Sequence, residues 1–274
     1  PDWILSGRSG LPPAARQQQV LDLAHPEAYA WIAQRLHALL DEYPIAYLKW
    51  DHNRDLTTAG LHDGTAGYRA QVHAAYALFA RIRAAHPEVE IESCSGGGGR
   101  IDFGVLRHTH RVWTSDCIDA LSRVDIQRGF LQFFPPEIMG AHVGSARAHT
   151  TGRTQSMAFR AAVALSGHFG VELDARILSE ADAAELKAWI QMYKGLRDRL
   201  HHGQVWQGAI DDGIVWQAHG DVDVTGMASD VLLLVYRTQP TNHRYTPRLP
   251  LPMLDTQANY RLQQFLPEGT VLPT

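Results

Sequence analysis

The chain is poor in cysteine, in long apolar runs and in surplus charge of either sign. Its 274 residues include two cysteines, Cys94 and Cys117, too few for a disulfide scaffold, so we expect free thiols. The 25 basic and 29 acidic residues give a net charge of -4, without the basic surplus that attracts nucleic acid or an anionic membrane. No apolar run approaches the length of a membrane span. We therefore expect no nucleic-acid partner and no membrane association. As a separate expectation, we assign the protein to the cytoplasm.

The chain also lacks the sequence signatures of several common sites. It has neither the G-x-S-x-G elbow of serine hydrolases nor the G-x-G-x-x-G fingerprint of dinucleotide-binding proteins. Its histidine pairs, His108 with His110 and His201 with His202, lack the H-E-x-x-H spacing of a zinc site. We expect these histidines to be solvated or to cap helices, and we expect no metal ion and no cofactor. The chain begins at Pro1 rather than Met, which we interpret as a piece of a longer protein.

Strand-like and helical segments alternate over the first 200 residues. The apolar spacing predicts strands at 44–48, 89–94, 111–115, 138–143 and 169–173, and helices at 27–42, 68–85, 120–133, 153–166 and 181–200. Strands that alternate with helices in this way predict parallel βαβ units. After residue 203 only short alternating runs occur, which are typical of antiparallel strands. We therefore divide the chain into a first domain at 1–203 and a small antiparallel β domain at 204–274.

Polar or glycine-rich residues follow each predicted strand of the first domain. The clearest segments are K-W-D-H-N-R at 49–54, C-S-G-G-G-G-R at 94–100 and W-T-S-D at 113–116. A (β/α)8 barrel carries its catalytic groups at these strand ends, and a doubly wound sheet binds its ligands there too, so both folds stay open on this pattern. The four glycines allow the backbone to approach a ligand closely, although a flexible turn would use them as well.

Asp51 and Asp116 are the candidate catalytic carboxylates. Side chains alternate along a strand, so Lys49 and Asp51 share a face, and a neighbouring cation would keep Asp51 ionised as a nucleophile requires. Asp116 follows the predicted strand at 111–115, which is the second strand after the one that precedes Asp51. Two carboxylates at one barrel mouth fit glycoside hydrolysis, and the structural alternative for Asp51 is a salt bridge at a strand end.

Five other acidic residues compete for these roles. Glu92 lies deeper in its strand, where we expect a structural salt bridge. Asp119 and Asp125 lie beyond a strand end and are expected to cap a helix or face solvent. Glu172 and Asp174 follow the last strand and are candidate ligands for a sugar hydroxyl.

The three strand-end segments, in this order, resemble the family 36 glycoside hydrolases, which are melibiase-like α-galactosidases and related enzymes. Similar segments are the opening P-D-W, P-E-I-M-G-A-H at 136–142, T-G-R at 151–153 and F-G-V-E-L-D at 169–174. The resemblance covers most of residues 1–203. It implies an α/β fold with about the last five βα units of a (β/α)8 barrel, followed by a small antiparallel β-sandwich domain.

The resemblance implies a retaining α-galactosidase in which Asp51 is the nucleophile and Asp116 is the acid/base. It also implies that the galactose is held by Lys49, Asn53, Cys94, Gly96 and Gly97. We add Arg54 and Trp113 as candidate substrate-binding residues, although alternation along the strand predicts that Trp113 faces away from Asp116 and packs in the core. The expected substrates are α-galactosides such as melibiose and raffinose, and the full-length protein is expected to be a homo-oligomer.

Two alternatives stay open beside this interpretation. A sugar in place of water as acceptor would make the protein a galactosyl transglycosylase of the raffinose family. A complete barrel takes about 250 residues, so five βα units in roughly 200 residues could also form an incomplete and inactive barrel. Cys117 and Ile118 stand where the family often has Asn and Thr, which changes the hydrogen bonding around the leaving group.

Overall fold

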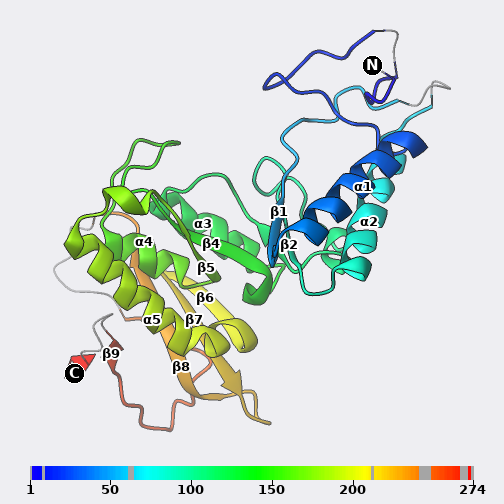
Figure 1. Cartoon of the computed structure of the whole chain (residues 1–274). Helices are drawn as coiled ribbons and strands as arrows, with labels where there is room; N and C mark the ends of the chain where they lie inside the picture. The colour runs from blue at the N-terminus through cyan, green and yellow to red at the C-terminus, as the bar shows by residue number, and fades with distance from the viewer. Residues whose placement is uncertain are drawn as a thin grey trace. The chain divides into compact units, whose positions relative to one another are not determined.

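The computed structural model describes residues 2–7, 10–60, 65–210, 213–240 and 248–265, and the backbone of residues 271–272. Figure 1 shows the chain with its elements labelled. It forms two compact units, Pro1–Asp116 and Cys117–Thr274, and each is described by itself. Among the described residues, no helix has the length and apolar character needed to cross a lipid bilayer.

The first unit is built around three parallel strands. Its elements are α1 (Pro26–Glu42), β1 (Tyr47–Trp50), α2 (Tyr68–Ala85), β2 (Glu90–Ser93), the short helix η1 (Val105–Arg107) and β3 (Arg111–Trp113). β1 pairs in parallel with β2, and β2 pairs in parallel with β3. Lys49 lies opposite Glu92 in the first pair, and Glu92 lies opposite Arg111 in the second. The two helices match the prediction closely, whereas β3 ends two residues earlier than predicted.

The core of this unit lies between the strands and the two helices. Phe79 and Ile82 of α2 and Ile91 of β2 are fully buried, and Leu40 of α1 packs against the same cluster. Burying each of these side chains contributes about 1.5–3 kcal/mol relative to leaving it exposed. Pro26 occupies the first turn of α1, where its missing N–H costs no hydrogen bond. The apolar spacing of the two helices therefore decides which face packs on the strands.

The second unit combines two parallel strands, their helices and an antiparallel sheet. Its first part holds α3 (Ala120–Phe130), η2 (Pro136–Ile138), β4 (Met139–Gly144), α4 (Met157–Ala164), β5 (His168–Glu172), η3 (Ala175–Ile177) and α5 (Glu180–His202). β4 and β5 pair in parallel. The antiparallel sheet has the order β6 (Gln204–Ile210), β7 (Ile214–Val222) and β8 (Ala228–Arg237). β9 (Gln264–Phe265) and β10 (Val271–Leu272) form a separate antiparallel pair.

Strand β7 is buried on both of its faces. Trp216 packs with Trp206 and Met253 on one face. Tyr236 of β8 lies in the cluster on the other face, and its hydroxyl donates to the backbone oxygen of Ala162 in α4 at 3.1 Å. The five parallel strands and this separate sheet confirm the predicted fold class, a partial (β/α)8 barrel followed by a small antiparallel β domain. The predicted domain boundary at 203 falls between α5 and β6 and stays a prediction.

Candidate active site

One face of the three strands in the first unit carries charged and polar side chains in layers. The layer nearest the start of the strands holds Tyr47, Glu90 and Arg111. Arg111 pairs with Glu90, and its guanidinium lies 5.1 Å from the ring centroid of Tyr47. The interior of a barrel is usually filled by branched apolar residues, so a charged side chain on this face needs an oppositely charged partner beside it. Arg111 and Glu90 are such partners for each other.

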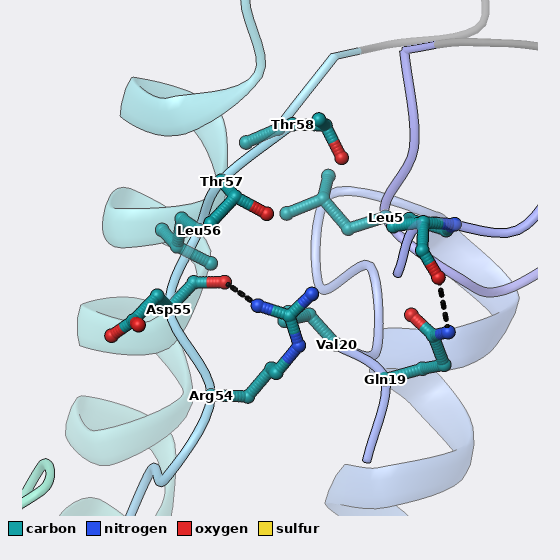
Figure 2. Close-up of a pocket in the computed structure, with 10 residues that line it drawn as sticks. Leu5, Gln19, Val20, Arg54, Asp55, Leu56, Thr57 and Thr58 are labelled. Carbon is teal, nitrogen blue, oxygen red and sulfur yellow. Dashed lines mark hydrogen bonds between the residues drawn. The ribbon is translucent and has the colours of Figure 1, made fainter. Parts of the chain in front are cut away.

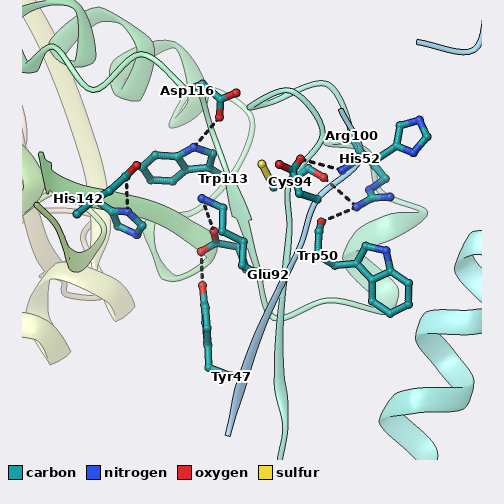
Figure 3. A network of polar contacts seen from close by, with 12 residues as sticks. Tyr47, Trp50, His52, Glu92, Cys94, Arg100, Trp113, Asp116 and His142 are labelled. Atoms are coloured by element: carbon teal, nitrogen blue, oxygen red, sulfur yellow. Dashed lines mark hydrogen bonds and ion pairs between the residues drawn. The ribbon is translucent and has the colours of Figure 1, made fainter. Parts of the chain in front are cut away.

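The next layer holds Lys49, Glu92 and Trp113. The Lys49 ammonium lies 3.6 Å from Glu92 Oε1 and 4.2 Å from the centroid of the Trp113 ring. Glu92 is 1% exposed, and its other oxygen accepts a hydrogen bond from the Tyr47 hydroxyl, which helps to raise the pKa of Tyr47 after the larger effect of burial. The prediction of a structural salt bridge at Glu92 is confirmed. Figure 3 shows Tyr47, Glu92, Trp113 and Asp116 rising in this order along the face.

Asp51 follows β1 directly, at the carboxyl end of the strand. The backbone N–H of His52 donates to its Oδ1 at 2.8 Å, and the side-chain amide of Asn53 donates to its Oδ2. Partial burial alone would raise the pKa of Asp51, but hydrogen bonds from the Cys94 thiol, the Asn53 amide and the N–H groups of His52 and Gly96 outweigh it and lower the pKa. Asp51 is therefore ionised at neutral pH.

The charged state of Asp51 has a different source from the one predicted. Sequence reasoning assigned it to a neighbouring cation, Lys49. In the structure the ammonium of Lys49 pairs with Glu92, because Glu92 is the residue directly opposite Lys49 on the neighbouring strand. The neutral donors around Asp51, rather than a salt bridge, hold its pKa down.

Cys94 follows β2 and lies next to Asp51. It is 1% exposed, and burial together with the hydrogen bond to Asp51 raises the pKa of its thiol to about 12, against a smaller lowering by the backbone N–H of Gly97. A thiol with so high a pKa stays protonated, so it acts as a donor to Asp51 and not as a nucleophile. Both Cys94 and Cys117 are free, as predicted.

The glycine run after Cys94 links the end of β1 to the segment after β3. Gly96 and Gly97 have positive φ angles of 52° and 83°, which L side chains adopt only with strain. The N–H of Gly96 contributes to the hydrogen bonds of Asp51. A Cβ atom on Gly97 would lie 2.7 Å from the backbone nitrogen of Asp116, and one on Gly98 would lie 2.4 Å from the oxygen of Thr114. The same short loop therefore contacts the Asp51 carboxylate and the Asp116 backbone.

Arg100 closes this loop and was not singled out from the sequence. Its guanidinium donates to the backbone oxygens of Trp50 and Cys94 at 2.8 and 2.9 Å, and to the Ser93 hydroxyl at 3.0 Å. These bonds join the carboxyl ends of β1 and β2. The arginine that ends the C-S-G-G-G-G-R segment was the sequence signal for this role.

Asp116 lies exposed in the segment after β3 and accepts a hydrogen bond from the Trp113 indole N–H at 3.1 Å. The prediction that Trp113 faces away from Asp116 is wrong, whereas its predicted burial in the core is confirmed. Strand alternation applies only up to Trp113, because β3 ends there and the backbone of 114–116 has no strand geometry. Trp50, in contrast, packs edge-on against Phe79 at 4.6 Å between ring centroids, away from this face.

Arg54 lies within the fold of the first unit. Its guanidinium donates to the backbone oxygen of Asp55 at 2.7 Å and to that of Pro13, and the residue is 6% exposed. Figure 2 shows this side chain in a cleft that Leu5, Gln19 and Val20 also line. These contacts join the loop after β1 to the N-terminal segment, and a role for Arg54 in substrate binding stays a prediction.

A separate cavity of about 540 Å³ lies on the helix side of β1. Trp50 and His52 line it, together with Val72, Ala75 and Tyr76 of α2. Trp50 faces α2 from the side of β1 opposite to Lys49, so this cavity lies behind the strand. Asn53, Arg54 and Gly96 also line it, whereas neither Asp51 nor Asp116 does.

Four of the competing acidic residues lie in the second unit, and each has a partner there. Asp119 caps α3 by accepting a hydrogen bond from the N–H of Leu121, and it also accepts from Thr151 at 2.7 Å and from Arg153 at 2.5 Å. Burial alone would raise the pKa of Asp119, but these hydrogen bonds outweigh it and lower the pKa. Glu172 lies 3.0 Å from the His142 ring, and Asp174 caps η3. Asp125 is exposed and lies 4.0 Å from Arg128. The expectation that Asp119 and Asp125 cap a helix or face solvent is confirmed, and a sugar contact for Glu172 or Asp174 stays a prediction.

The histidine expectation is wrong for His201. This residue is buried, and its Nε2 lies 3.2 Å from both the Gly167 oxygen and the Tyr193 hydroxyl. Long α5 places it against β5, where polar atoms need internal partners. His202 lies 3.0 Å from the Asp198 oxygen one turn earlier. The described residues contain no group of three or more His, Cys, Asp or Glu side chains arranged to hold a metal ion.

Comparison with known proteins gives consistent results. A family model described as Melibiase matches residues 1–203. An α-galactosidase of Escherichia coli is 42% identical over 263 residues, which is 96% of this chain and 37% of that protein. Alpha-galactosidase C of Emericella nidulans is 36% identical over 95% of this chain and 34% of that protein. The chain thus spans about a third of the length of these relatives.

Solved structures agree with the sequence relatives. A variant of the GH36 α-galactosidase AgaA from Geobacillus stearothermophilus, in complex with raffinose, superposes with a TM-score of 0.85 at 30% identity. The match covers 93% of this chain and 36% of that one. The α-galactosidase domain of the α-galactosidase–sucrose kinase AgaSK gives a TM-score of 0.86 at 30% identity, over 99% of this chain and 37% of that one.

Proposed function

Because the chain belongs to the Melibiase family of glycoside hydrolases, we propose that it carries the catalytic carboxylates of a retaining α-galactosidase. Asp51 is the nucleophile and Asp116 is the acid/base in this proposal. The observation that supports it best is the set of four donors that keep Asp51 ionised at a strand end. The glycine loop, which contacts both the Asp51 carboxylate and the Asp116 backbone, supports a common site for the two residues.

The reaction takes place in two steps. Asp51 attacks the anomeric carbon of a terminal α-linked galactose while Asp116 gives its proton to the departing glycosidic oxygen. Water then attacks the galactosyl ester, giving its proton to Asp116, and Asp51 leaves as a carboxylate. Two inversions at the anomeric carbon give net retention, which requires the two carboxyl groups to lie about 5–5.5 Å apart.

The galactose is held in this proposal by Lys49, Asn53, Cys94, Gly96 and Gly97. About a third of the Lys49 side chain is exposed, so its ammonium has donors to spare beyond Glu92. Asn53 and Cys94 already donate to Asp51, so any contact they make with the sugar also affects the nucleophile. Trp113 borders the same site through Lys49 and Asp116.

Melibiose and raffinose are the proposed substrates, supported by the raffinose complex of the structural relative. Water is the proposed acceptor, and a second sugar as acceptor would make a transglycosylase. Incubation with raffinose and a second sugar separates the two, because only transfer yields a new galactoside. We also propose a homo-oligomeric and cytoplasmic full-length protein, to be tested by analytical ultracentrifugation and cell fractionation.

The test of the proposed function is hydrolysis of 4-nitrophenyl α-galactoside followed by proton NMR. The first galactose released should be the α anomer, and release of the β anomer would contradict retention. The assay is made on this chain and on the whole protein to which the sequence belongs, because the chain spans 37% of the Escherichia coli relative. Absence of hydrolysis by the whole protein, or a preference for the α-N-acetylgalactosaminide, would reject the α-galactosidase assignment.

A further inference from the structure

The side chains beneath Asp116 form one continuous series of contacts. The Tyr47 hydroxyl donates to Glu92, whose Oε1 lies 3.6 Å from the Lys49 ammonium. That ammonium lies 4.2 Å from the centroid of the Trp113 ring, and the Trp113 Nε1–H donates to Asp116 Oδ1 at 3.1 Å. Figure 3 shows the series from Tyr47 at its base to Asp116 at its top.

From this geometry we propose that Trp113 is a positioning residue for Asp116, and that the Lys49–Glu92 pair holds the Trp113 ring in place. The inference rests on the proposed role of Asp116 as acid/base. An indole nitrogen is a donor only, so the oxygen that it contacts must be an acceptor. When Asp116 is protonated, its proton is therefore on Oδ2, and Trp113 decides which oxygen presents it to the glycosidic bond.

The surroundings of Trp113 restrict the orientation of its ring. The residue is 1% exposed, so the ring cannot turn without displacing its neighbours. The Lys49 cation over its face adds an attraction that strengthens when the cation is desolvated. Glu92 supplies the negative charge that keeps this cation in place. Its Oε1 lies 3.6 Å from the ammonium, and no hydrogen-bond donor among the described residues reaches that oxygen, so its charge is directed at Lys49.

The test is the dependence of kcat/KM on the leaving group, measured in the whole protein. The substrates are 2,4-dinitrophenyl, 4-nitrophenyl, phenyl and methyl α-galactosides, which need increasing help from a proton donor as the leaving group becomes more basic. Trp113→Phe keeps an aromatic ring beneath Lys49 and removes the N–H. We expect a loss of about tenfold or more on the methyl galactoside and of less than about threefold on the dinitrophenyl galactoside.

Trp50→Phe is the matched control, because Trp50 lies on the opposite face of β1 against Phe79. This variant should change kcat/KM by the same factor for all four substrates, so that its leaving-group dependence equals that of the unsubstituted protein. Glu92→Gln keeps an acceptor for Tyr47 but removes the charge that holds Lys49, so it should steepen the leaving-group dependence in the same direction as Trp113→Phe. This second variant carries the test if Trp113→Phe does not fold.

Two results separate failure of this inference from failure of the proposed function. Asp116→Ala should show the steepest leaving-group dependence of the series. If it shows none, Asp116 is not the acid and the proposed function fails. If Asp116→Ala shows the dependence but Trp113→Phe and Glu92→Gln lower kcat/KM equally for all substrates, the positioning role is overturned.

Discussion

Replacement of Gly97 by alanine should damage the site through one close backbone contact. Gly97 has a φ angle of 83°, and a Cβ atom there would lie 2.7 Å from the nitrogen of Asp116 and 3.0 Å from Cα of Ser115. Both atoms belong to the backbone, so no side chain can move aside to relieve the overlap. Gly96 is the matched control, because its φ angle of 52° is also positive but an added Cβ would meet nothing within 4 Å.

The two substitutions share one energetic cost and differ in another. A left-handed backbone conformation costs an L residue about 1–2 kcal/mol, which applies to both Gly96→Ala and Gly97→Ala. Overpacking against fixed neighbours costs about 1–3 kcal/mol more, and it applies to Gly97→Ala alone. That difference corresponds to a melting temperature about 2–12 °C lower for Gly97→Ala than for Gly96→Ala.

Activity should separate the two variants more strongly than stability does. The overlap at Gly97 is relieved by moving the backbone of Asp116, and misplacement of a catalytic group by 1 Å can cost about a hundredfold. We expect kcat/KM of Gly97→Ala to be at least about tenfold below that of Gly96→Ala, measured well below both melting temperatures. Equal melting temperatures and equal activities would refute the close approach of the glycine loop to Asp116.

Three further predictions concern single side chains. Azide should partly restore activity to Asp116→Ala and give α-galactosyl azide, whereas α-galactosyl azide from Asp51→Ala, and no such product from Asp116→Ala, would reverse the two roles. Cys94→Ala removes a hydrogen bond that helps to lower the pKa of Asp51, so the acidic limb of the kcat/KM profile should move to higher pH, and an unchanged limb would contradict the contact. Burial lowers the pKa of His219 from 6.5 to about 4 and outweighs the opposite effect of its hydrogen bond to the Leu200 oxygen. As the pH falls, His219 is therefore protonated more readily in the unfolded chain than in the folded one. Stability is then complete above pH 6.5 and falls toward pH 4 by up to about 3 kcal/mol, and His219→Gln should remove this loss in urea unfolding, whereas an unchanged pH dependence would contradict it.

The elements were predictable where local signals set their bounds. Pro26 begins α1 and Pro44 follows its end, and α2 ends shortly before Pro87, so both helices could be placed from the sequence. β3 was harder to bound, because the polar residues after Trp113 fit a strand pattern as well as a loop.

The positions of Asp51 and Asp116 at strand ends were also predictable, because parallel strands carry their polar residues at one end. Their partners were not. Lys49 and Asp51 share a face, but only the register between β1 and β2 shows that Glu92 takes the ammonium. The contact between Trp113 and Asp116 depends on the path of the loop after β3, which alternation along a strand cannot describe.

The donors around Asp51 illustrate the same limit. The family resemblance placed Gly96 near the sugar, and it did not indicate a hydrogen bond between Gly96 and Asp51. The structure directs its N–H to the Asp51 carboxylate, beside the Cys94 thiol. Such a set of donors depends on the fold of a turn with positive φ angles, whose direction the sequence does not specify.

The most direct test of the central claim is to trap the galactosyl ester on Asp51. The whole protein is incubated with 5-fluoro-α-galactosyl fluoride, digested and analysed by tandem mass spectrometry. We expect one fluorogalactosyl group on the peptide that contains Asp51, on the carboxyl group of that residue. A label on Asp116, or turnover that releases an inverted sugar and leaves no label, would contradict the account.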